Sequence, residues 1–245
     1  MIKNILENLY ILKNLYMIKY NISLTYTDAF VYVKDFVNDV TFDLLNKSLI
    51  SSSLEYSYYT ENGCIYKSPR QMCWYAENLE WNYPFSKSHG KGLSAHAFTE
   101  SPYIERVLDE LESRLGVRYN SMLLNYYKTG DEYSAWHSDD DPWLDNRFPI
   151  ASITVGSPRE FLVRPRLADH MGVKNFTKSV KDGVRSFTLE SGSLLLMNAG
   201  AQEYWRHALP PQPGTGERIN MTFRMIDPDK VSLQYTDKLK SKWSS

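Results

Sequence analysis

The second half of the chain alternates hydrophobic and polar positions in short runs. From Ser121 onward, runs of five to nine residues rich in Val, Ile, Leu, Phe and Tyr are separated by turn-forming residues, a pattern typical of β-strands. The runs are "SMLLNYY", "FPIASITV", "EFLVR", "RSFTLE", "SLLLMN", "EYWRHAL" and "RINMTFRMI". Short strands at this spacing predict a sandwich or jelly roll.

The first half has a mixed pattern. "AFVYVKDF" has the composition of a strand, whereas "DVTFDLLNKSLI" has apolar residues at helical spacing. The clearest helix is "SPYIERVLDELESRLG", where Ser101 is the N-cap, Pro102 the first helical residue and Gly116 the stop. We therefore expect an α+β protein, in which N-terminal helices pack outside a double-stranded β-helix (jelly roll) core and help to build a substrate-recognition lid.

The N-terminal stretch is amphipathic rather than continuously apolar. Its apolar residues recur every three or four positions, which predicts a short helix, and charged residues interrupt it before it reaches the length of a secretory signal or a membrane span. We expect an N-terminal extension over residues 1–28, a single domain over 29–229 and a polar C-terminal tail over 230–245, with no membrane contact.

Composition and charge limit the possible partners. The net charge of −1 gives no overall field that attracts a polyanion, so nucleic acid would need a local basic surface. One stretch could supply it, unless it is a solvated loop of mixed charge. Its basic residues are Arg159, Arg164, Arg166, Lys174, Lys178, Lys181 and Arg185. Cys64 and Cys73 fit no disulfide framework or zinc motif, which indicates a soluble intracellular protein, nuclear or cytoplasmic. We expect a monomer.

The stretch "SAWHSDDDPWL" places a histidine just ahead of three consecutive aspartates. Adjacent carboxylates repel one another, so the run needs a cation, hydrogen-bond donors or solvent. His137 and Asp139 would point to the same side of an extended segment, where they could bind one ion together. His207, in a later strand, is the best third ligand. Two imidazoles and one carboxylate can form a facial triad that binds Fe(II) and leaves positions open for a co-substrate and O₂.

The strand "RINMTFR" has one apolar face and one polar face. Its polar residues are Arg218, Asn220, Thr222 and Arg224. Two arginines on the inner face of a barrel strand need anionic partners, which a dicarboxylate such as 2-oxoglutarate supplies. In an edge strand the arginines would instead reach solvent. Asn125 and Tyr127, which share one face of an earlier strand, offer an amide and a phenol to a bound carboxylate.

The motifs taken together resemble the AlkB-type Fe(II)/2-oxoglutarate-dependent dioxygenases, which oxidatively remove alkyl groups from nucleobases. The resemblance runs from about Val31 to Ile226, and the motifs keep the order of that family. They are "LLNYYKTGDEYSAWHSDDD", "PIASITVGSPREF", "SGSLLLMN", "WRHALP" and "RINMTFR". The resemblance implies that Fe(II), 2-oxoglutarate and O₂ are required, and that the lid recognises a nucleotide.

Residue roles follow from this resemblance. It implies that His137, Asp139 and His207 ligate the iron. Arg218, Asn125 and Tyr127 would hold the far carboxylate of 2-oxoglutarate. Arg224 and Thr222 would lie near its metal-chelating end, and Asn220 would belong to the same polar face. The implied substrate residues are Arg70 in "SPRQMCWYA", Tyr83 and Phe85 in "YPFS", and Asp141 near the exocyclic amine of the base.

One departure from the family concerns the strandedness of the substrate. Members that invade duplex DNA carry an aromatic finger where this chain has Asn62, although Tyr58 and Tyr59 are close by in the sequence. Single-stranded DNA or RNA, whose bases flip at little cost, is therefore the favoured substrate, and duplex DNA remains possible.

The resemblance implies oxidative demethylation of bases of the 1-methyladenine and 3-methylcytosine type, as direct reversal of alkylation damage. Three alternatives remain open at this point. The substrate could be a protein or another molecule that is not a nucleic acid, or the chain could bind alkylated bases without turning them over. A zinc hydrolase could use the same three ligands, but that leaves the Arg218 and Arg224 pair unexplained.

Overall fold

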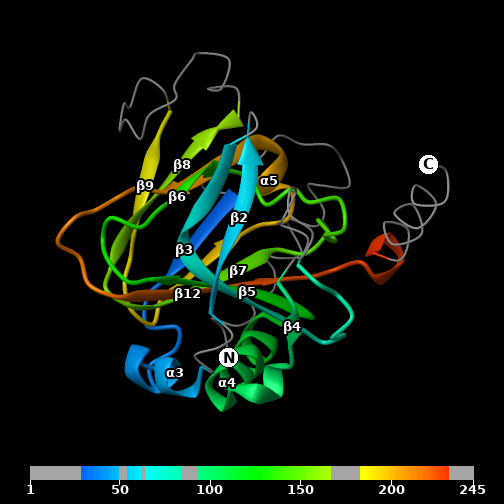
Figure 1. The fold of residues 1–245 in the computed structure, drawn as a ribbon. Coiled ribbons are helices and arrows are strands. Elements are labelled where there is room, and N and C mark those ends of the chain that lie inside the picture. Colours follow the sequence, from blue (N-terminus) through cyan, green and yellow to red (C-terminus); the bar gives the residue numbers. More distant parts are fainter. Residues whose placement is uncertain (1–28, 50–53, 62–63, 84–92, 167–182, 232–245) are drawn as a thin grey trace.

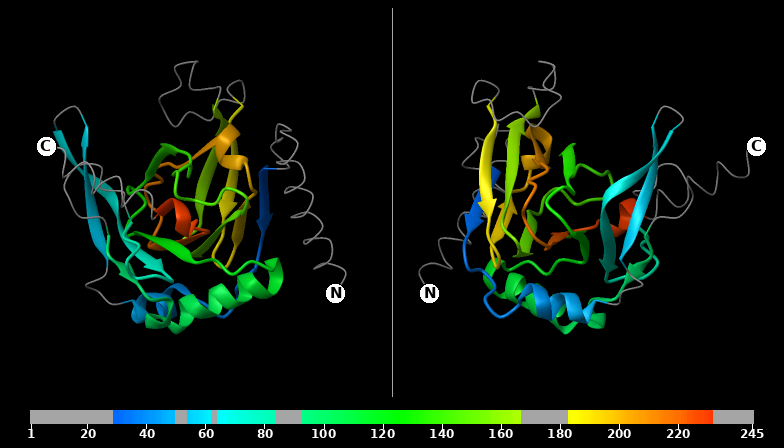
Figure 2. Two further views of the ribbon diagram at one scale, coloured as in Figure 1. Left: turned by 90° about the vertical axis from the view of Figure 1, so that its right-hand side faces the viewer. Right: turned by 60° about the vertical axis from the view of Figure 1, so that its left-hand side comes forward.

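The computed structural model describes residues 29–49, 54–61, 64–83, 93–166 and 183–231, which form two β-sheets that face each other (Figures 1 and 2). The larger sheet has the order β1-β10-β7-β12-β5-β3-β2, with β4 paired to β3, and the smaller sheet has the order β6-β11-β8-β9. All pairings except β3 with β4 are antiparallel. This is the predicted jelly roll.

The strands alternate between the sheets along much of the chain. The strands of the larger sheet are β1 (Phe30–Val33), β2 (Glu55–Glu61), β3 (Cys64–Ala76), β4 (Ala95–His96), β5 (Ser121–Tyr127), β7 (Ile150–Gly156), β10 (Leu194–Met197) and β12 (Arg218–Arg224). Those of the smaller sheet are β6 (Ser134–His137), β8 (Arg159–Pro165), β9 (Arg185–Leu189) and β11 (Trp205–Leu209). The helices are α3 (Phe42–Ser48), the 3-10 turn η2 (Phe98–Glu100), α4 (Pro102–Leu115) and α5 (Ala201–Tyr204).

Helices α3 and α4 pack on the outer face of the larger sheet (Figure 2). As predicted, α4 begins with Pro102 at its first turn and ends at Gly116, whose φ of +70° suits glycine. Its buried residues meet the apolar residues Ile219, Met221 and Phe223 of β12 in one hydrophobic core. The opposite, polar face of β12 therefore points between the two sheets.

Strand β12 is a central strand. It pairs with β5 on one side and β7 on the other, and all seven of its residues are buried. The alternative that its arginines reach solvent from a sheet edge is therefore wrong. Burying two guanidinium groups in a protein interior costs free energy unless anions compensate their charge. The position of β12 therefore indicates an anion-binding site between the two sheets.

The β2–β3 hairpin was not predicted as strands. Helices and a lid were expected in this half of the chain, yet β3 extends the larger sheet by pairing with β5 from Gln71 to Ala76. Between Tyr56 and Tyr58 the register of the hairpin shifts, since residue 56 pairs with 71 whereas residue 58 pairs with 67. Such an irregularity interrupts the alternation by which a strand is found in a sequence.

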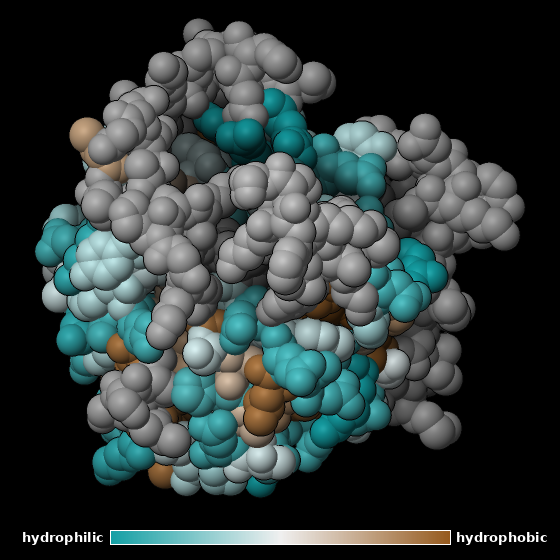
Figure 3. Space-filling view, turned by 45° about the vertical axis from the view of Figure 1, so that its right-hand side comes forward, coloured by the Kyte–Doolittle hydropathy of each residue, from teal (hydrophilic) through white to brown (hydrophobic). Residues whose placement is uncertain are grey.

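The ends of the chain outside the described residues include the predicted extension over 1–28 and most of the predicted tail. The first tail residues are described: Lys230 donates a hydrogen bond to the Leu144 carbonyl, and Val231 packs against buried apolar residues. Within the described residues, no helix is long and apolar enough to cross a membrane. On the face shown in Figure 3, hydrophobic residues lie in small separate groups among hydrophilic ones.

Gly156, at the end of β7, supports a prediction about stability. Its φ is +96°, and an added Cβ would lie 2.5 Å from the Glu217 carbonyl oxygen. We expect Gly156→Ala to lower the free energy of unfolding by about 3 kcal/mol, measured by urea denaturation. Gly214 is the matched control, because its φ is +88° but an added Cβ meets nothing within 4 Å. Equal losses for both alanine variants would contradict the steric argument.

Candidate active site

Three predicted metal ligands converge between the sheets. His137 ends β6, and its backbone pairs with that of His207 on β11. Asp139 follows two residues later, and one potential ligand atom from each of the three residues lies within 4.8 Å of the others. Nε2 of His137 is 3.6 Å from Oδ1 of Asp139, and the ring centroids of His137 and His207 are 4.2 Å apart. Since β6 ends at His137, Asp139 reaches the site from a loop and not from the strand.

Neighbouring groups orient the two imidazoles. Nδ1 of His137 is 2.7 Å from the Ala135 carbonyl, so it carries the proton and leaves Nε2 free to face Asp139. The Phe161 ring stacks on His207, with centroids 5.2 Å apart and planes at 21°. Both histidines thus have a fixed orientation before any ion binds.

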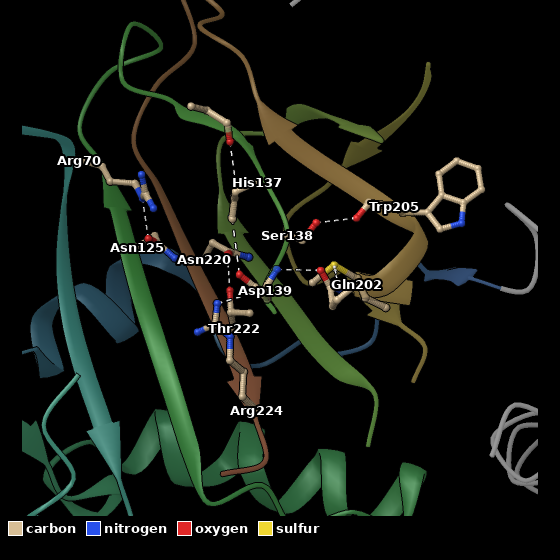
Figure 4. Close-up of polar contacts among 12 residues, drawn as sticks. Arg70, Asn125, His137, Ser138, Asp139, Gln202, Trp205, Asn220, Thr222 and Arg224 are labelled. Carbon is tan, nitrogen blue, oxygen red and sulfur yellow. Dashed lines mark hydrogen bonds and ion pairs between the residues drawn. The ribbon is translucent and has the colours of Figure 1, made fainter. Parts of the chain in front are cut away.

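The electrostatics suit a divalent cation. Burial lowers the pKa of His207 to about 3 and also lowers the pKa of His137, so both imidazoles are neutral. Burial alone would raise the pKa of Asp139, but the charge and hydrogen bond of Arg224 together with the two neighbouring histidines outweigh it, and the pKa lies well below its usual range. Nη2 of Arg224 is 2.8 Å from Oδ2 of Asp139 (Figure 4). Two neutral imidazoles and one ionised carboxylate are the donor set that Fe(II) takes in a facial triad.

The predicted co-substrate residues lie on adjacent strands. In the β12–β5 register Arg218 is opposite Tyr127, and Asn220 is opposite Asn125. Nη2 of Arg218 donates to Thr154 Oγ1 at 2.8 Å, but its Nε and Nη1 have no hydrogen-bond partner among the described residues. Burial lowers the pKa of Arg218 to about 10, which still leaves it charged at neutral pH. A buried guanidinium with unused donors fits a bound carboxylate.

Asn220 and Thr222 lie between Arg218 and Arg224 on the polar face of β12. Asn220 Nδ2 donates to Ser152 Oγ at 2.8 Å and to the Ile153 carbonyl, and Asn220 Oδ1 accepts from Thr222 Oγ1 at 2.9 Å. These bonds fix both side chains (Figure 4). Arg224 also keeps Nε and Nη1 without a partner among the described residues. The polar face of β12 therefore offers cationic donors at both ends, as a dicarboxylate requires.

Three guanidinium groups surround Tyr127. Their carbons lie 5.2 Å (Arg218), 5.9 Å (Arg70) and 5.9 Å (Arg159) from the centroid of its ring. Of these three arginines, only Arg218 was predicted at this end of the site, together with Asn125 and Tyr127. Arg70 was predicted on the substrate side, but its Nε donates to Asn125 Oδ1 at 2.6 Å (Figure 4). It thus joins the predicted substrate and co-substrate regions.

The predicted basic surface is wrong for two of its members. Arg159 is fully buried, and its Nη2 donates to the carbonyls of Glu132 and Pro210 at 3.0 and 2.7 Å. Arg164 is buried with its guanidinium carbon 4.4 Å from the centroid of the Trp136 ring. Both side chains lie in the interior, where they cannot contact a phosphate at the surface. The three lysines of the stretch lie outside the described residues.

Asp140 and Asp141, the last two aspartates of the "DDD" run, have different surroundings. Asp140 is exposed to solvent, and its Oδ2 pairs with Nη1 of Arg166 at 2.9 Å. Asp141 lines a cavity beside the ligand loop, together with Asp139, Arg224 and residues 198–200. It is therefore close to the proposed metal site, as its assignment to a substrate requires.

The remaining substrate residues are partly described. Tyr83 is buried, with its ring 4.8 Å from that of Trp74 and 6.1 Å from that of Trp143. Burial raises the pKa of Tyr83, and the charges of Asp141 and Asp139 add to this, so its phenol is neutral and near both carboxylates. Phe85 and Asn62 lie outside the described residues. Tyr58, named as a substitute for the finger, is 49% exposed on β2.

Gln202 is a further residue that the sequence analysis did not single out. Its side-chain oxygen accepts a hydrogen bond from the backbone N–H of Asp139 at 2.9 Å (Figure 4). The only signal in the sequence is its position five residues before His207. The sequence does not otherwise distinguish a glutamine that is buried next to a metal ligand from one on the surface.

Comparisons with known proteins agree with this geometry. The 2OG-Fe(II) oxygenase superfamily profile matches residues 30–224. DNA oxidative demethylase ALKBH2 of Arabidopsis thaliana is 31% identical over 170 residues, which cover 64% of this chain and 53% of the relative. Alpha-ketoglutarate-dependent dioxygenase alkB homolog 3 of Homo sapiens is 32% identical over 170 residues, which cover 67% and 54%. The chain thus spans about half the length of these two relatives.

The fold comparison points the same way. The solved structure of OsALKBH1 matches with a TM-score of 0.50 and 19% identity, covering 80% of this chain and 98% of that one. At this identity the match concerns the fold alone. The profile spans strands of both sheets and the His-Asp-His cluster. The chain therefore belongs to the 2OG-Fe(II) oxygenase superfamily, and it is similar in sequence to relatives of the AlkB type.

Proposed function

We propose that this chain oxidatively removes N-linked methyl groups from nucleic-acid bases while 2-oxoglutarate is converted to succinate and CO₂. One observation carries the proposal: the His-Asp-His cluster is ion-paired with Arg224, which shares the polar face of β12 with Arg218, and both buried arginines have unused donors. A zinc hydrolase would need the cluster but not the arginines, and a binding module would need neither. The relatives named DNA oxidative demethylase support a nucleobase as the substrate.

The family uses Fe(II), 2-oxoglutarate and O₂. In this chain His137, Asp139 and His207 would hold the iron. Arg218, Asn125 and Tyr127 would bind the far carboxylate of 2-oxoglutarate, with Arg224 and Thr222 near its other end and Asn220 between them. When bound, iron and 2-oxoglutarate would supply the oxidation with O₂, one oxygen atom of which goes to succinate and the other to the N-methyl carbon as a hydroxyl group. The hydroxymethyl group would then leave the base nitrogen as formaldehyde, and the nitrogen would keep the hydroxyl proton or release it to solvent.

The protein's own contribution is orientation and charge. Because burial keeps both histidines neutral and Arg224 keeps Asp139 ionised, no proton competes with a metal at the ligand atoms at neutral pH. The polar face of β12 is buried between the sheets, so water is largely excluded from the co-substrate. Hydrogen bonds within the sheet fix Asn220 and Thr222, so binding requires little reordering.

The expected bases carry a positive charge, as 1-methyladenine and 3-methylcytosine do. Asp141 lines the cavity next to Asp139, and its carboxylate would attract a cationic base. Tyr83 would line the pocket, Arg70 would lie on its nucleic-acid side, and Phe85 would stack on the base. We propose single-stranded DNA or RNA as the favoured polymer, and a domain over 29–229 that acts as a monomer.

An activity panel tests the proposal. The purified chain is incubated with Fe(II), 2-oxoglutarate and an oligonucleotide that carries 3-methylcytosine, as single-stranded DNA, duplex DNA or RNA. We expect mass spectrometry to show loss of one methyl group, with a rate on a single strand at least about 10-fold higher than on a duplex, since flipping a paired base costs a few kcal/mol. An otherwise identical oligonucleotide with the neutral base 3-methylthymine should react more slowly.

Controls separate the alternatives. Omission of 2-oxoglutarate should abolish methyl loss, and a methylated peptide of matched concentration should remain unchanged. Methyl loss from the peptide but from none of the three nucleic acids would contradict the nucleobase proposal. Binding of the methylated oligonucleotide without any turnover would support a binding module instead.

A further inference from the structure

The segment that carries Asp139 has no strand to hold it. Strand β6 ends at His137, and residues 138–141 form no strand or helix. A ligand on such a segment would be poorly positioned unless side-chain contacts replace the missing sheet hydrogen bonds, because a metal site requires its ligands in a fixed geometry. The contacts of this segment therefore decide how well Asp139 is placed.

Each of three consecutive residues in the segment is fixed by a different contact. Ser138 Oγ donates to the Trp205 carbonyl at 2.9 Å, and the N–H of Asp139 donates to Gln202 Oε1 at 2.9 Å. Asp140 pairs with Arg166, whose Nη1 also donates to the Gln202 carbonyl at 3.0 Å. The contacts lead to residues 202–205, which connect directly to His207 (Figure 4).

Gln202 occupies the central position among these contacts. It is 9% exposed, and its Nε2 lies 3.5 Å from the Met197 sulfur, so its oxygen faces the N–H of Asp139. The side chain thus joins the loop that carries one predicted ligand to the one-turn helix α5, which precedes the strand that carries another. An apolar side chain would fill the same volume but would leave the Asp139 N–H without its acceptor, which is unfavourable for a backbone donor away from water.

We propose that Gln202 is a positioning residue for the metal-binding carboxylate of Asp139, and that Arg166 holds Gln202 in place. The backbone hydrogen bond fixes the peptide from which the Asp139 side chain leaves, while Arg224 fixes the far end of that side chain. Arg166 also compensates the charge of Asp140, so that the neighbouring carboxylate does not compete for the cation. This inference rests on the proposed metal centre.

The test measures binding of Mn(II) alone, without 2-oxoglutarate or substrate, by isothermal titration calorimetry. Gln202→Met keeps the length of the side chain but removes the acceptor, and we expect it to weaken Mn(II) binding about 10-fold or more, as loss of an outer hydrogen bond to a metal ligand typically does. Gln202→Glu keeps an acceptor at the same place, so it should retain most of the affinity. Rescue by the acceptor distinguishes positioning from filling of space.

Two further variants complete the test. Glu203→Gln changes an exposed neighbour on α5 and should bind Mn(II) as the wild type does. Arg166→Met, whose side chain is partly exposed, should fold even if Gln202→Met does not, and it should weaken Mn(II) binding about 3-fold or more. Unchanged Mn(II) affinity in Arg166→Met, or in a folded Gln202→Met, would overturn the inference.

The outcome also separates this inference from the proposed function. If the wild type binds Mn(II) and demethylates an oligonucleotide, but Gln202→Met binds Mn(II) equally well, only the positioning role is lost. If the wild type binds no Mn(II), the metal centre fails, and the proposed function and the role of Gln202 fail with it.

Discussion

Asp139→Ala is expected to abolish 2-oxoglutarate turnover, with a loss of more than about 100-fold. Substitution of groups that only support a metal ligand typically costs 10- to 100-fold, so loss of a ligand itself should cost more. The carboxylate also supplies the only negative charge among the three predicted ligands. Succinate production, measured by mass spectrometry with Fe(II) in excess, gives the rate.

The same substitution is also expected to lower the stability of the metal-free protein. Removing Asp139 leaves Arg224 buried without its ion-pair partner, which typically lowers the free energy of unfolding by about 3–5 kcal/mol. Asp139→Asn, with the same shape and no charge, distinguishes charge from packing. Asp131→Ala, an exposed carboxylate in the turn before β6, is the control and should keep its turnover. Full turnover by Asp139→Ala would contradict the assignment of the site.

Arg218→Met is expected to raise the KM for 2-oxoglutarate by at least about 30-fold. Truncating one partner of a buried charged pair costs 2–5 kcal/mol, and each 1.4 kcal/mol is a factor of ten. Arg218 is 1% exposed and lies opposite Tyr127, so no solvent can replace the lost interaction. Initial rates of succinate formation over a range of 2-oxoglutarate concentrations measure the effect.

The metal site provides the internal control for this variant. Arg218 makes no contact with the three predicted ligands in the described residues, so the affinity of Arg218→Met for Mn(II) should remain close to that of the wild type. Arg118→Met removes a surface guanidinium that pairs with Asp109 and Glu112, and it should leave the KM unchanged. An unaltered KM in Arg218→Met would refute the assignment of this arginine to the co-substrate.

The parts of the fold that could be predicted depend on local patterns. The two-residue alternation of "RINMTFR" is intrinsic to a strand, so its polar face was visible without any knowledge of its neighbours. The caps of α4 are equally local. The two-residue spacing of His137 and Asp139 and the position of His207 in a later strand predicted that the three converge, and the resemblance of the motif order to a known family supported it. Asp139 nevertheless lies in a loop where an extended segment was expected.

Other features could not be predicted because they arise from distant contacts. The charge of Arg159 suggested a surface role, but the carbonyls that its guanidinium binds come from residues 27 and 51 positions away. Strand β3 carries polar residues and a shifted register, so its sequence does not alternate regularly. Gln202 gains its importance only from the backbone of a loop 63 positions earlier.

The distribution of the site over two layers has a mechanical consequence. The predicted ligands belong to the smaller sheet and its loop, whereas Arg218 and Asn220 belong to the larger sheet. Facing sheets are separated by a spacing of about 10 Å that the interleaved side chains set. In this chain Tyr127, Phe161 and Leu195 pack in one cluster between the layers. Such side chains set the distance between the predicted metal ligands and Arg218, so a change in their volume would alter that distance.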